Sequence, residues 1–271
     1  NDNVLSVIGI DSFNVLGIRI ISRTVSFIIL ICTCYVFYKI ITSYLKLKKS
    51  LAIMLTLLIV VFTFPWYSLS RPDVLILFFI ILSIFILLKY LDKRRLRYIL
   101  GLGSLLFLSV MSKQNGMFVI LVFGLFFLLN REWKSILFMF FGFLGSGILF
   151  YLFLVIAGYD ISFIKANIVD GLNNSVDFQY AINKPYKKFI IYFTLFTIGA
   201  IVIIKNHFKP WLKPQLTFRF LIVLSILIMF LFSTITAVKV GSGVNYFNEF
   251  LVLMLLAIAY SIRNISDRFI K

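Results

Sequence analysis

The sequence predicts an all-α, polytopic bundle of about nine transmembrane helices, and three observations support this fold class. Of the 271 residues, 62% are hydrophobic and only 14% are charged, whereas a soluble domain carries about a quarter charged residues. The apolar residues form long continuous runs without the period-two alternation of an outer-membrane β-barrel. A membrane helix needs roughly 20 apolar residues, which leaves room for about eight to ten helices. We therefore treat 1–271 as a single integral membrane domain.

The apolar runs predict helices in a definite order, and each break between them has a physical reason. The predicted helices cover 22–44, 51–67, 73–91, 97–111, 117–130, 135–157, 189–204, 217–238 and 246–262. The breaks are, in turn, the basic segment 45–50, the Ser-Arg-Pro turn 70–72, the basic segment 92–96, the polar segment 112–116, the Asn-Arg-Glu turn 130–132, the long connector 158–188, the Lys- and Pro-containing segment 205–216, and the Gly-containing segment 239–245. Glycines within the helices, at 101, 103, 142, 145 and 147, are expected at close helix–helix contacts.

The charges predict the orientation of the bundle. If successive helices alternate in direction, one set of connectors carries 18 basic and 3 acidic residues, net +15, and the other carries 9 basic and 7 acidic residues, net +2. By the positive-inside rule the first set is cytoplasmic, so Asn1 lies outside and Lys271 inside. The overall charge of +17 then reflects topology and gives no support for nucleic-acid binding. An N-terminus outside predicts at least one further transmembrane helix before Asn1.

The connector 158–188 is the longest polar segment and is predicted to lie outside the membrane. It contains enough apolar residues for a short interfacial helix. It is either an idle surface loop or a lid over a substrate, because loops longer than a connection requires are often functional.

The first of three polar clusters is Ser70-Arg71-Pro72-Asp73. Ser70 as N-cap, Pro72 in the first turn and Asp73 three residues after the cap are typical of a helix start. Arg71 is not explained in this way, because a cation beside a helix N-terminus is unfavourable unless an anion lies nearby.

The second cluster, 112–116, has two interpretations. It either ends a helix, with Lys113 at the negative helix end and Gly116 in a left-handed conformation, or it binds an anion. In the second case Lys113 is the cation, and Gln114 or Asn115 supplies hydrogen bonds.

The third cluster, 239–249, contains Asn245, Asn248 and Glu249 on one face of a beginning helix. Glu249 is predicted about one turn inside the membrane, where an ionisable group is costly and is by default a functional candidate. The alternative is a structural ion pair between Lys239 and Glu249.

Helix alternation places all three clusters on the outer face, among apolar helices. The cations Arg71, Lys113 and Lys239 and the carboxylates Asp73 and Glu249 suit a ligand that is part lipid and part anion, such as a polyprenyl-phosphate-linked sugar. The predicted substrate-binding residues are Arg71, Lys113, Gln114, Lys239, Asn245 and Tyr246. No cofactor is evident, a divalent metal is left open, and the isolated His207 predicts no zinc site.

The order and spacing of segments 70–73, 112–116 and 241–250 (Gly-Ser-Gly-Val-Asn-Tyr-Phe-Asn-Glu-Phe) resemble those of the GT-C superfamily of membrane glycosyltransferases. The nearest branch is the bacterial and archaeal relatives of protein O-mannosyltransferases and lipid A aminoarabinose transferases. The resemblance implies a multi-pass protein of a prokaryotic plasma (inner) membrane. It also implies inverting transfer of a sugar from a polyprenyl-phosphate donor to an acceptor on the extracytoplasmic side, for the cell envelope.

The family resemblance further implies a catalytic Asp in the first external loop, after a first helix. We expect this helix and loop to lie upstream of Asn1, so that the chain is an N-terminally shortened glycosyltransferase. Asp73 and Glu249 are the candidate catalytic carboxylates in the sequence itself. The full-length protein is then an enzyme, and the activity of this chain alone stays open. The alternatives are a transporter of lipid-linked substrates, a non-catalytic lipid-binding membrane subunit, and a purely structural membrane protein.

Overall fold

The computed structural model describes residues 15–69, 72–113, 115–159, 175–191, 216–240 and 242–269, together with 162, 165, 194, 197–198 and 201. All named elements in this part of the chain are helices, and its one β contact is an isolated antiparallel bridge between Val176 and Lys239. Five of these helices are long and apolar enough to cross a membrane. The prediction of an all-α membrane protein is confirmed.

A helix covers each predicted run except 189–204, of which only a part is described. The elements are α2 (Val15–Lys39) with its π-helical extension η1 (Ile40–Tyr44), α3 (Lys49–Ser68), α4 (Asp73–Lys93), α5 (Leu96–Ser112), α6 (Gly116–Leu129), α7 (Trp133–Ile156), α9 (Phe178–Ala181), the π-helix η4 (Ile182–Tyr186), α11 (Phe218–Thr236), the 3-10 helix η5 (Val244–Phe247) and α12 (Asn248–Phe269). Residues 187–191 continue the helix after η4, whereas most of the predicted interfacial helix lies outside the described residues.

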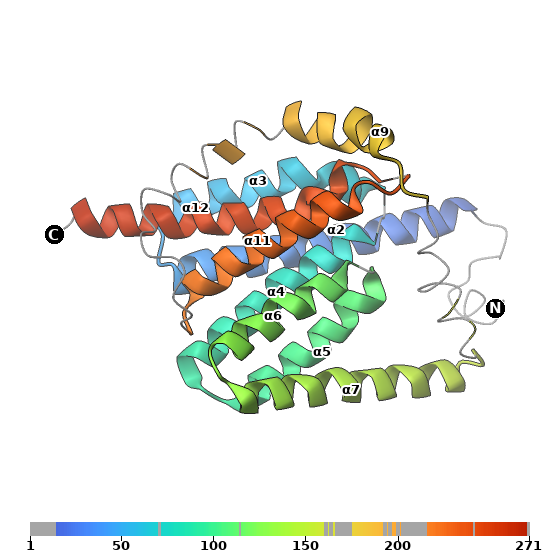
Figure 1. The fold of residues 1–271 in the computed structure, drawn as a ribbon, viewed down its shortest axis with the longest axis horizontal. Coiled ribbons are helices and arrows are strands. Elements are labelled where there is room, and N and C mark those ends of the chain that lie inside the picture. The colour runs from blue at the N-terminus through green and yellow to red at the C-terminus, as the bar shows by residue number, and fades with distance from the viewer. Residues whose placement is uncertain are drawn as a thin grey trace.

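Successive long helices run back and forth, so their connections alternate between two ends of the bundle (Figure 1). One end of the bundle lies on the right of Figure 1, and we call it the site end. It contains the last residues of α3, α5 and α11 and the first residues of α4, α6 and α12. At the other, α4 and α6 end and α5 and α7 begin; we call it the basic end. The three polar clusters of the sequence therefore belong to the site end. The charge bias predicts that the site end faces outside.

Helix α12 forms the centre of the bundle. Its segment from Phe250 to Ala257 is buried throughout, and it packs against α3, α4 and α11. By contrast, α7 leaves most of its apolar side chains exposed, as expected of a helix that faces lipid. The first turn of α12, which carries Glu249, therefore begins inside the protein and not at its lipid-facing surface.

Helices α5 and α7 lie in close backbone contact because glycines occupy their interface. A Cβ atom on Gly103 would lie 2.0 Å from the carbonyl oxygen of Met139, and one on Gly142 would lie 2.0 Å from that of Leu100. The Ser104 hydroxyl also donates a hydrogen bond to the Gly142 carbonyl, at 3.3 Å. Gly103 and Gly142 are thus close-packing positions, as predicted. The same prediction was wrong for Gly101 and Gly145, which face open space.

Replacing Gly142 with alanine should separate α5 from α7, because the added methyl group meets backbone and not a movable side chain. We expect a loss of about 3 kcal/mol in the free energy of unfolding, the upper part of the range for overpacked cores. Gly145→Ala is the matched control on the same helix and should be neutral or slightly stabilising. Thermal unfolding of the purified protein in detergent measures both, and equal losses at the two positions would contradict the packing argument.

Candidate functional site

The site end brings together residues from three distant segments. Asp73 is the first residue of α4, Lys113 follows the last residue of α5, and Tyr246 lies in η5 before α12. The Lys113 ammonium donates a hydrogen bond to the Asp73 carboxylate and forms an ion pair with it. The same ammonium lies over the Tyr246 ring, 4.1 Å from its centroid, which is close enough for a cation–π interaction.

The chain positions Lys113 through a tight connection between α5 and α6. Lys113 leaves the helix in an extended conformation (φ −163°, ψ 145°), and its N–H still donates to the Ser109 carbonyl at 3.2 Å. Its own carbonyl accepts from the Gly116 N–H at 2.8 Å. The prediction of a left-handed Gly116 was wrong: Gly116 begins α6 with a helical conformation. A glycine is needed there because α6 starts in contact with the Ser109 backbone.

The ion pair is buried. The side chain of Asp73 is 5% exposed and that of Lys113 is 16% exposed. Burial alone would lower the pKa of the Lys113 ammonium, but the carboxylates of Asp73 and Glu249 outweigh burial and raise this pKa above its ordinary value. Lys113 is therefore a permanent cation at neutral pH.

Helix α4 begins at Asp73, with Pro72 and not Ser70 as its cap residue. Pro72 occupies the cap position and makes no side-chain cap bond, and its carbonyl accepts from the N–H groups of Leu75 and Ile76. The carboxylate of Asp73 instead faces Lys113, while still lying at the positive end of α4 where a negative charge is favourable. Ser70, Arg71 and Gln114 lie outside the described residues.

Three polar residues of the third cluster lie inside the protein. Asn245, Asn248 and Glu249 are 1%, 3% and 1% exposed. The Oδ1 atom of Asn245 and both carboxylate oxygens of Glu249 have no hydrogen-bond partner among the described residues. The alternative of an ion pair between Lys239 and Glu249 is therefore wrong. Lys239 instead contributes its backbone to the bridge with Val176, and Glu249 interacts electrostatically with Lys113.

Residues 175–191 span the end of the long connector and the start of the predicted helix 189–204, and they lie against the hairpin of α11 and α12; we call this segment the strap. It pairs with the segment that follows α11 through the antiparallel bridge between Val176 and Lys239. The Tyr180 hydroxyl then donates to the Ser242 carbonyl at 2.8 Å. The strap is thus fixed to the residues that lead into η5.

Aromatic contacts continue this attachment toward the site. The Tyr186 hydroxyl donates to the Thr234 carbonyl at 2.6 Å. The Phe189 ring stacks on Phe247, with centroids 4.2 Å apart, and also contacts Phe250. Because Phe247 and Phe250 flank Asn248 and Glu249 in sequence, the strap covers the beginning of α12. Sequence reasoning missed Tyr180, Tyr186 and Phe189. Their only signal was that aromatic residues recur at the end of the polar connector and at the start of the predicted helix 189–204.

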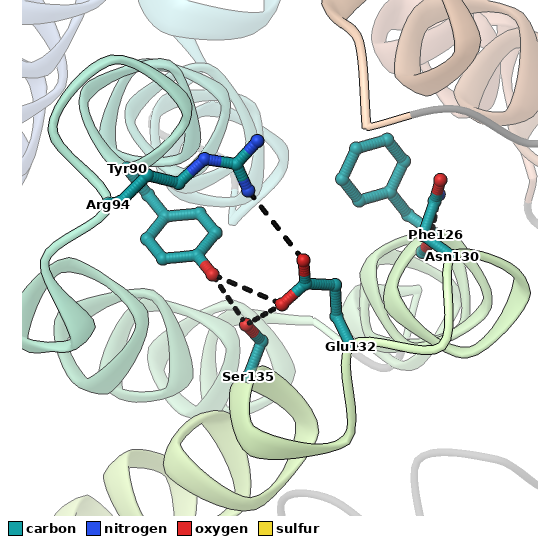
Figure 2. A network of polar contacts seen from close by, with 6 residues as sticks. All are labelled: Tyr90, Arg94, Phe126, Asn130, Glu132 and Ser135. Atoms are coloured by element: carbon teal, nitrogen blue, oxygen red, sulfur yellow. Dashed lines mark hydrogen bonds and ion pairs between the residues drawn. The ribbon is translucent and has the colours of Figure 1, made fainter.

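A second polar network lies at the basic end and has a different character (Figure 2). Glu132, just before α7, accepts hydrogen bonds from Tyr90 and Ser135, each at 3.3 Å, and forms an ion pair with Arg94 at 3.7 Å. Tyr90 and Ser135 are also hydrogen-bonded to each other, at 2.9 Å. Both oxygens of this carboxylate have partners, so the network joins the α4–α5 turn to the α6–α7 turn. Glu249 at the site end differs, because its carboxylate has no hydrogen-bond partner in the part of the chain that the structure describes.

The family model for dolichyl-phosphate-mannose-protein mannosyltransferases matches residues 11–159, which is more than half of the chain. The chain belongs to the dolichyl-phosphate-mannose-protein mannosyltransferase family. No curated protein and no solved structure matches it. Membership of this mannosyltransferase family confirms the resemblance to GT-C glycosyltransferases at the level of the superfamily, and it accounts for the multi-pass integral membrane fold.

The mannosyltransferase family uses a lipid-linked sugar donor, and this family match includes α2 to α7. Asp73 and Lys113 therefore lie inside the matched region. Tyr246 and Glu249 lie beyond it, in the C-terminal hairpin. The site end thus combines one part that the mannosyltransferase family model covers with another that it does not.

Proposed function

We propose that this protein transfers a sugar from a polyprenyl-phosphate-linked donor to an acceptor on the extracytoplasmic face of a prokaryotic plasma membrane. In this proposal the site end faces outside and holds the polar head of the donor, while the prenyl chain lies among the lipid-facing helices. The observation that carries the proposal is the buried ion pair of Asp73 and Lys113 beside Glu249, in a chain of a mannosyltransferase family. Buried charges are expensive, and at membrane depth they are by default functional.

Lys113 is the residue proposed to meet the phosphate of the donor. Its ammonium stays charged, and Tyr246 and Asp73 hold it in one position. A cation fixed in this way stabilises the negative charge that develops on the phosphate as the sugar leaves, without reorganising first. Arg71, Gln114 and Lys239 belong to the same clusters in sequence, and they are proposed to assist in donor binding.

Asp73 and Glu249 are the proposed catalytic carboxylates of the described chain. A general base must accept a proton from the acceptor hydroxyl, so its oxygen atoms must be able to meet that hydroxyl. The Asp73 carboxylate is engaged by Lys113 in a hydrogen bond and an ion pair, so it is less free to meet an acceptor hydroxyl. The Glu249 carboxylate has no such hydrogen bond.

The test uses the protein expressed from its complete gene and reconstituted in nanodiscs. Radiolabelled mannosyl-phosphoryl-dolichol is the probe, because the family name specifies this donor chemistry. We expect binding of the probe, release of dolichyl phosphate, and transfer of label to acceptors in added membranes. Binding without release would favour a transporter or a non-catalytic subunit over an enzyme, and absence of binding to this donor and to other polyprenyl-phosphate sugars would refute the proposal.

A further inference from the structure

Two buried side chains at the site end present unpartnered acceptor atoms to the same region. Asn245 and Glu249 are four residues apart, across the junction of η5 and α12, and each is 1% exposed. Residues at this spacing lie on one face of a helix. Together they offer three oxygen atoms that lack a hydrogen-bond partner among the described residues: Oδ1 of Asn245, and Oε1 and Oε2 of Glu249.

Two buried side chains with unpaired acceptor atoms destabilise the folded protein unless another group donates the missing hydrogen bonds. Buried polar atoms in folded proteins are nearly always hydrogen-bonded, and exceptions call for a functional explanation. A polar group that lacks its partners is also less stable in this position than an apolar side chain of the same size. Leucine or methionine would serve the fold at least as well, so the two acceptors point to a ligand that brings hydrogen-bond donors.

The surrounding charges limit the chemistry of that ligand. A metal ion would lie beside the Lys113 ammonium, which already interacts with Glu249, and like charges at such range repel. The carboxylate of Asp73, the nearest further ligand a metal would need, is engaged by the same ammonium. Neutral hydroxyl groups meet no such repulsion, and each supplies one donor.

We infer that Asn245 and Glu249 form a subsite for the hydroxyl groups of a saccharide substrate. This inference rests on the proposed function and assigns the substrate chemistry of one part of its site. The neighbouring residue Tyr246 holds Lys113 by the cation–π contact, so the subsite lies next to the cation proposed to bind phosphate. In a sugar phosphate the hydroxyls are only a few bonds from the phosphate, and the two positions match that order. Because both side chains are 1% exposed, part of the protein around them must move for a sugar to enter.

The experiment compares two lipid probes with the protein from its complete gene in nanodiscs: mannosyl-phosphoryl-dolichol, and dolichyl phosphate without a sugar. The variants are Glu249→Met and Asn245→Leu. The control, Ser261→Ala, removes another buried oxygen without a partner from α12, about 18 Å further along the helix. We expect each variant to weaken binding of the sugar lipid by about ten- to a hundred-fold. Affinity for dolichyl phosphate should not fall in either variant, and the midpoint of thermal unfolding should be unchanged or higher.

The results separate the two sources of the hydroxyl groups. Selective loss of the sugar lipid assigns the subsite to the donor sugar. Unchanged affinity for both lipids, together with a raised KM for the acceptor, assigns the subsite to the hydroxyl groups of the acceptor. Either outcome supports the inference. The control should match the wild type in every measurement.

Three results would overturn the inference. Unchanged binding and unchanged transfer in both variants would remove the subsite and the catalytic role proposed for Glu249, and would leave donor binding through Lys113 and sugar transfer by the protein intact. Equal weakening of both lipids with a lower unfolding midpoint would indicate a structural role. Donor binding that requires an added divalent cation, and that loses this requirement in both variants, would indicate a metal site instead. A wild-type protein that binds neither lipid would refute the proposed function itself.

Discussion

Replacing Lys113 with methionine should lower the free energy of unfolding by about 3–5 kcal/mol, the range for removing one partner of a buried ion pair. The Asp73 carboxylate, whose side chain is 5% exposed, would be left in a buried position without its counterion. Glu249 adds a second carboxylate to the same region. Donor binding should also be lost, because the cation proposed to meet the phosphate is gone. Thermal unfolding in detergent and binding of mannosyl-phosphoryl-dolichol in nanodiscs measure the two effects.

A double variant separates folding from binding. Asp73→Asn combined with Lys113→Met removes both charges, so most of the stability lost in Lys113→Met should return. Donor binding should not return, because neither residue then offers a positive charge. A Lys113→Met protein as stable as the wild type would show that the pair is effectively solvated, and the argument from burial would then fail.

Helix alternation was the strongest prediction from the sequence, because it depends only on the length of apolar runs. Each run must cross the bundle once, so every second connection lies at the same end. This placed Asp73, Lys113 and Glu249 at one end, and the structure brings them there. The orientation of that end in the membrane remains a prediction from the charge bias.

The partner of Lys113 was not predicted, although the sequence contained the information. Asp73 lies 20 residues before Lys93, where α4 ends, and Lys113 lies 17 residues after Leu96, where α5 begins. At about 1.5 Å per residue the two positions are nearly level in an antiparallel hairpin. The pair Lys239–Glu249 was weighed instead because its members are close in sequence. The relative position of two residues along packed antiparallel helices predicts an ion pair better than their closeness in sequence does.

The strap could not be predicted, for a different reason. Its attachment depends on backbone and aromatic contacts between segments far apart in sequence, such as Tyr180 with Ser242 and Phe189 with Phe247. Neither contact leaves a periodic pattern in the sequence. The strap therefore appeared only as part of a long connector, open to interpretation as a lid or as an idle loop.

The sequence analysis also predicted a left-handed backbone conformation at the wrong position. The non-glycine residues with positive φ in the described chain are Lys46, Arg94 and Arg131, with φ of 53°, 52° and 58°. Two of them, Arg94 and Arg131, lie in the turns that the Glu132 network joins. Glycine is preferred for this conformation but is not required, at a cost of about 1–2 kcal/mol per residue. Gly116 was predicted to have a left-handed conformation. It is needed instead because it lacks a side chain, which lets α6 pack closely against the backbone of α5.

Gly116→Ala should therefore destabilise the protein, whereas helix propensity alone predicts that it stabilises it. Propensity alone predicts that alanine at the start of α6 stabilises the helix by up to about 1 kcal/mol. The Cβ atom, however, would lie 2.3 Å from the carbonyl carbon and oxygen of Ser109 and 2.5 Å from the backbone nitrogen of Val110. Backbone atoms inside a helix cannot move aside cheaply, so the start of α6 must shift away from α5.

The shift would reach the site directly, because the Gly116 N–H donates to the Lys113 carbonyl at 2.8 Å. We expect a loss of about 3 kcal/mol or more in the free energy of unfolding, together with weaker binding of mannosyl-phosphoryl-dolichol. Gly124→Ala is the matched control, since Gly124 lies in the same helix and its added methyl group meets open space; it should bind the donor like the wild type and be slightly more stable. If both alanines stabilise the protein, the contact between α6 and Ser109 does not fix the position of Lys113, and the positioning of the proposed phosphate-binding cation must come from Tyr246 and Asp73 alone.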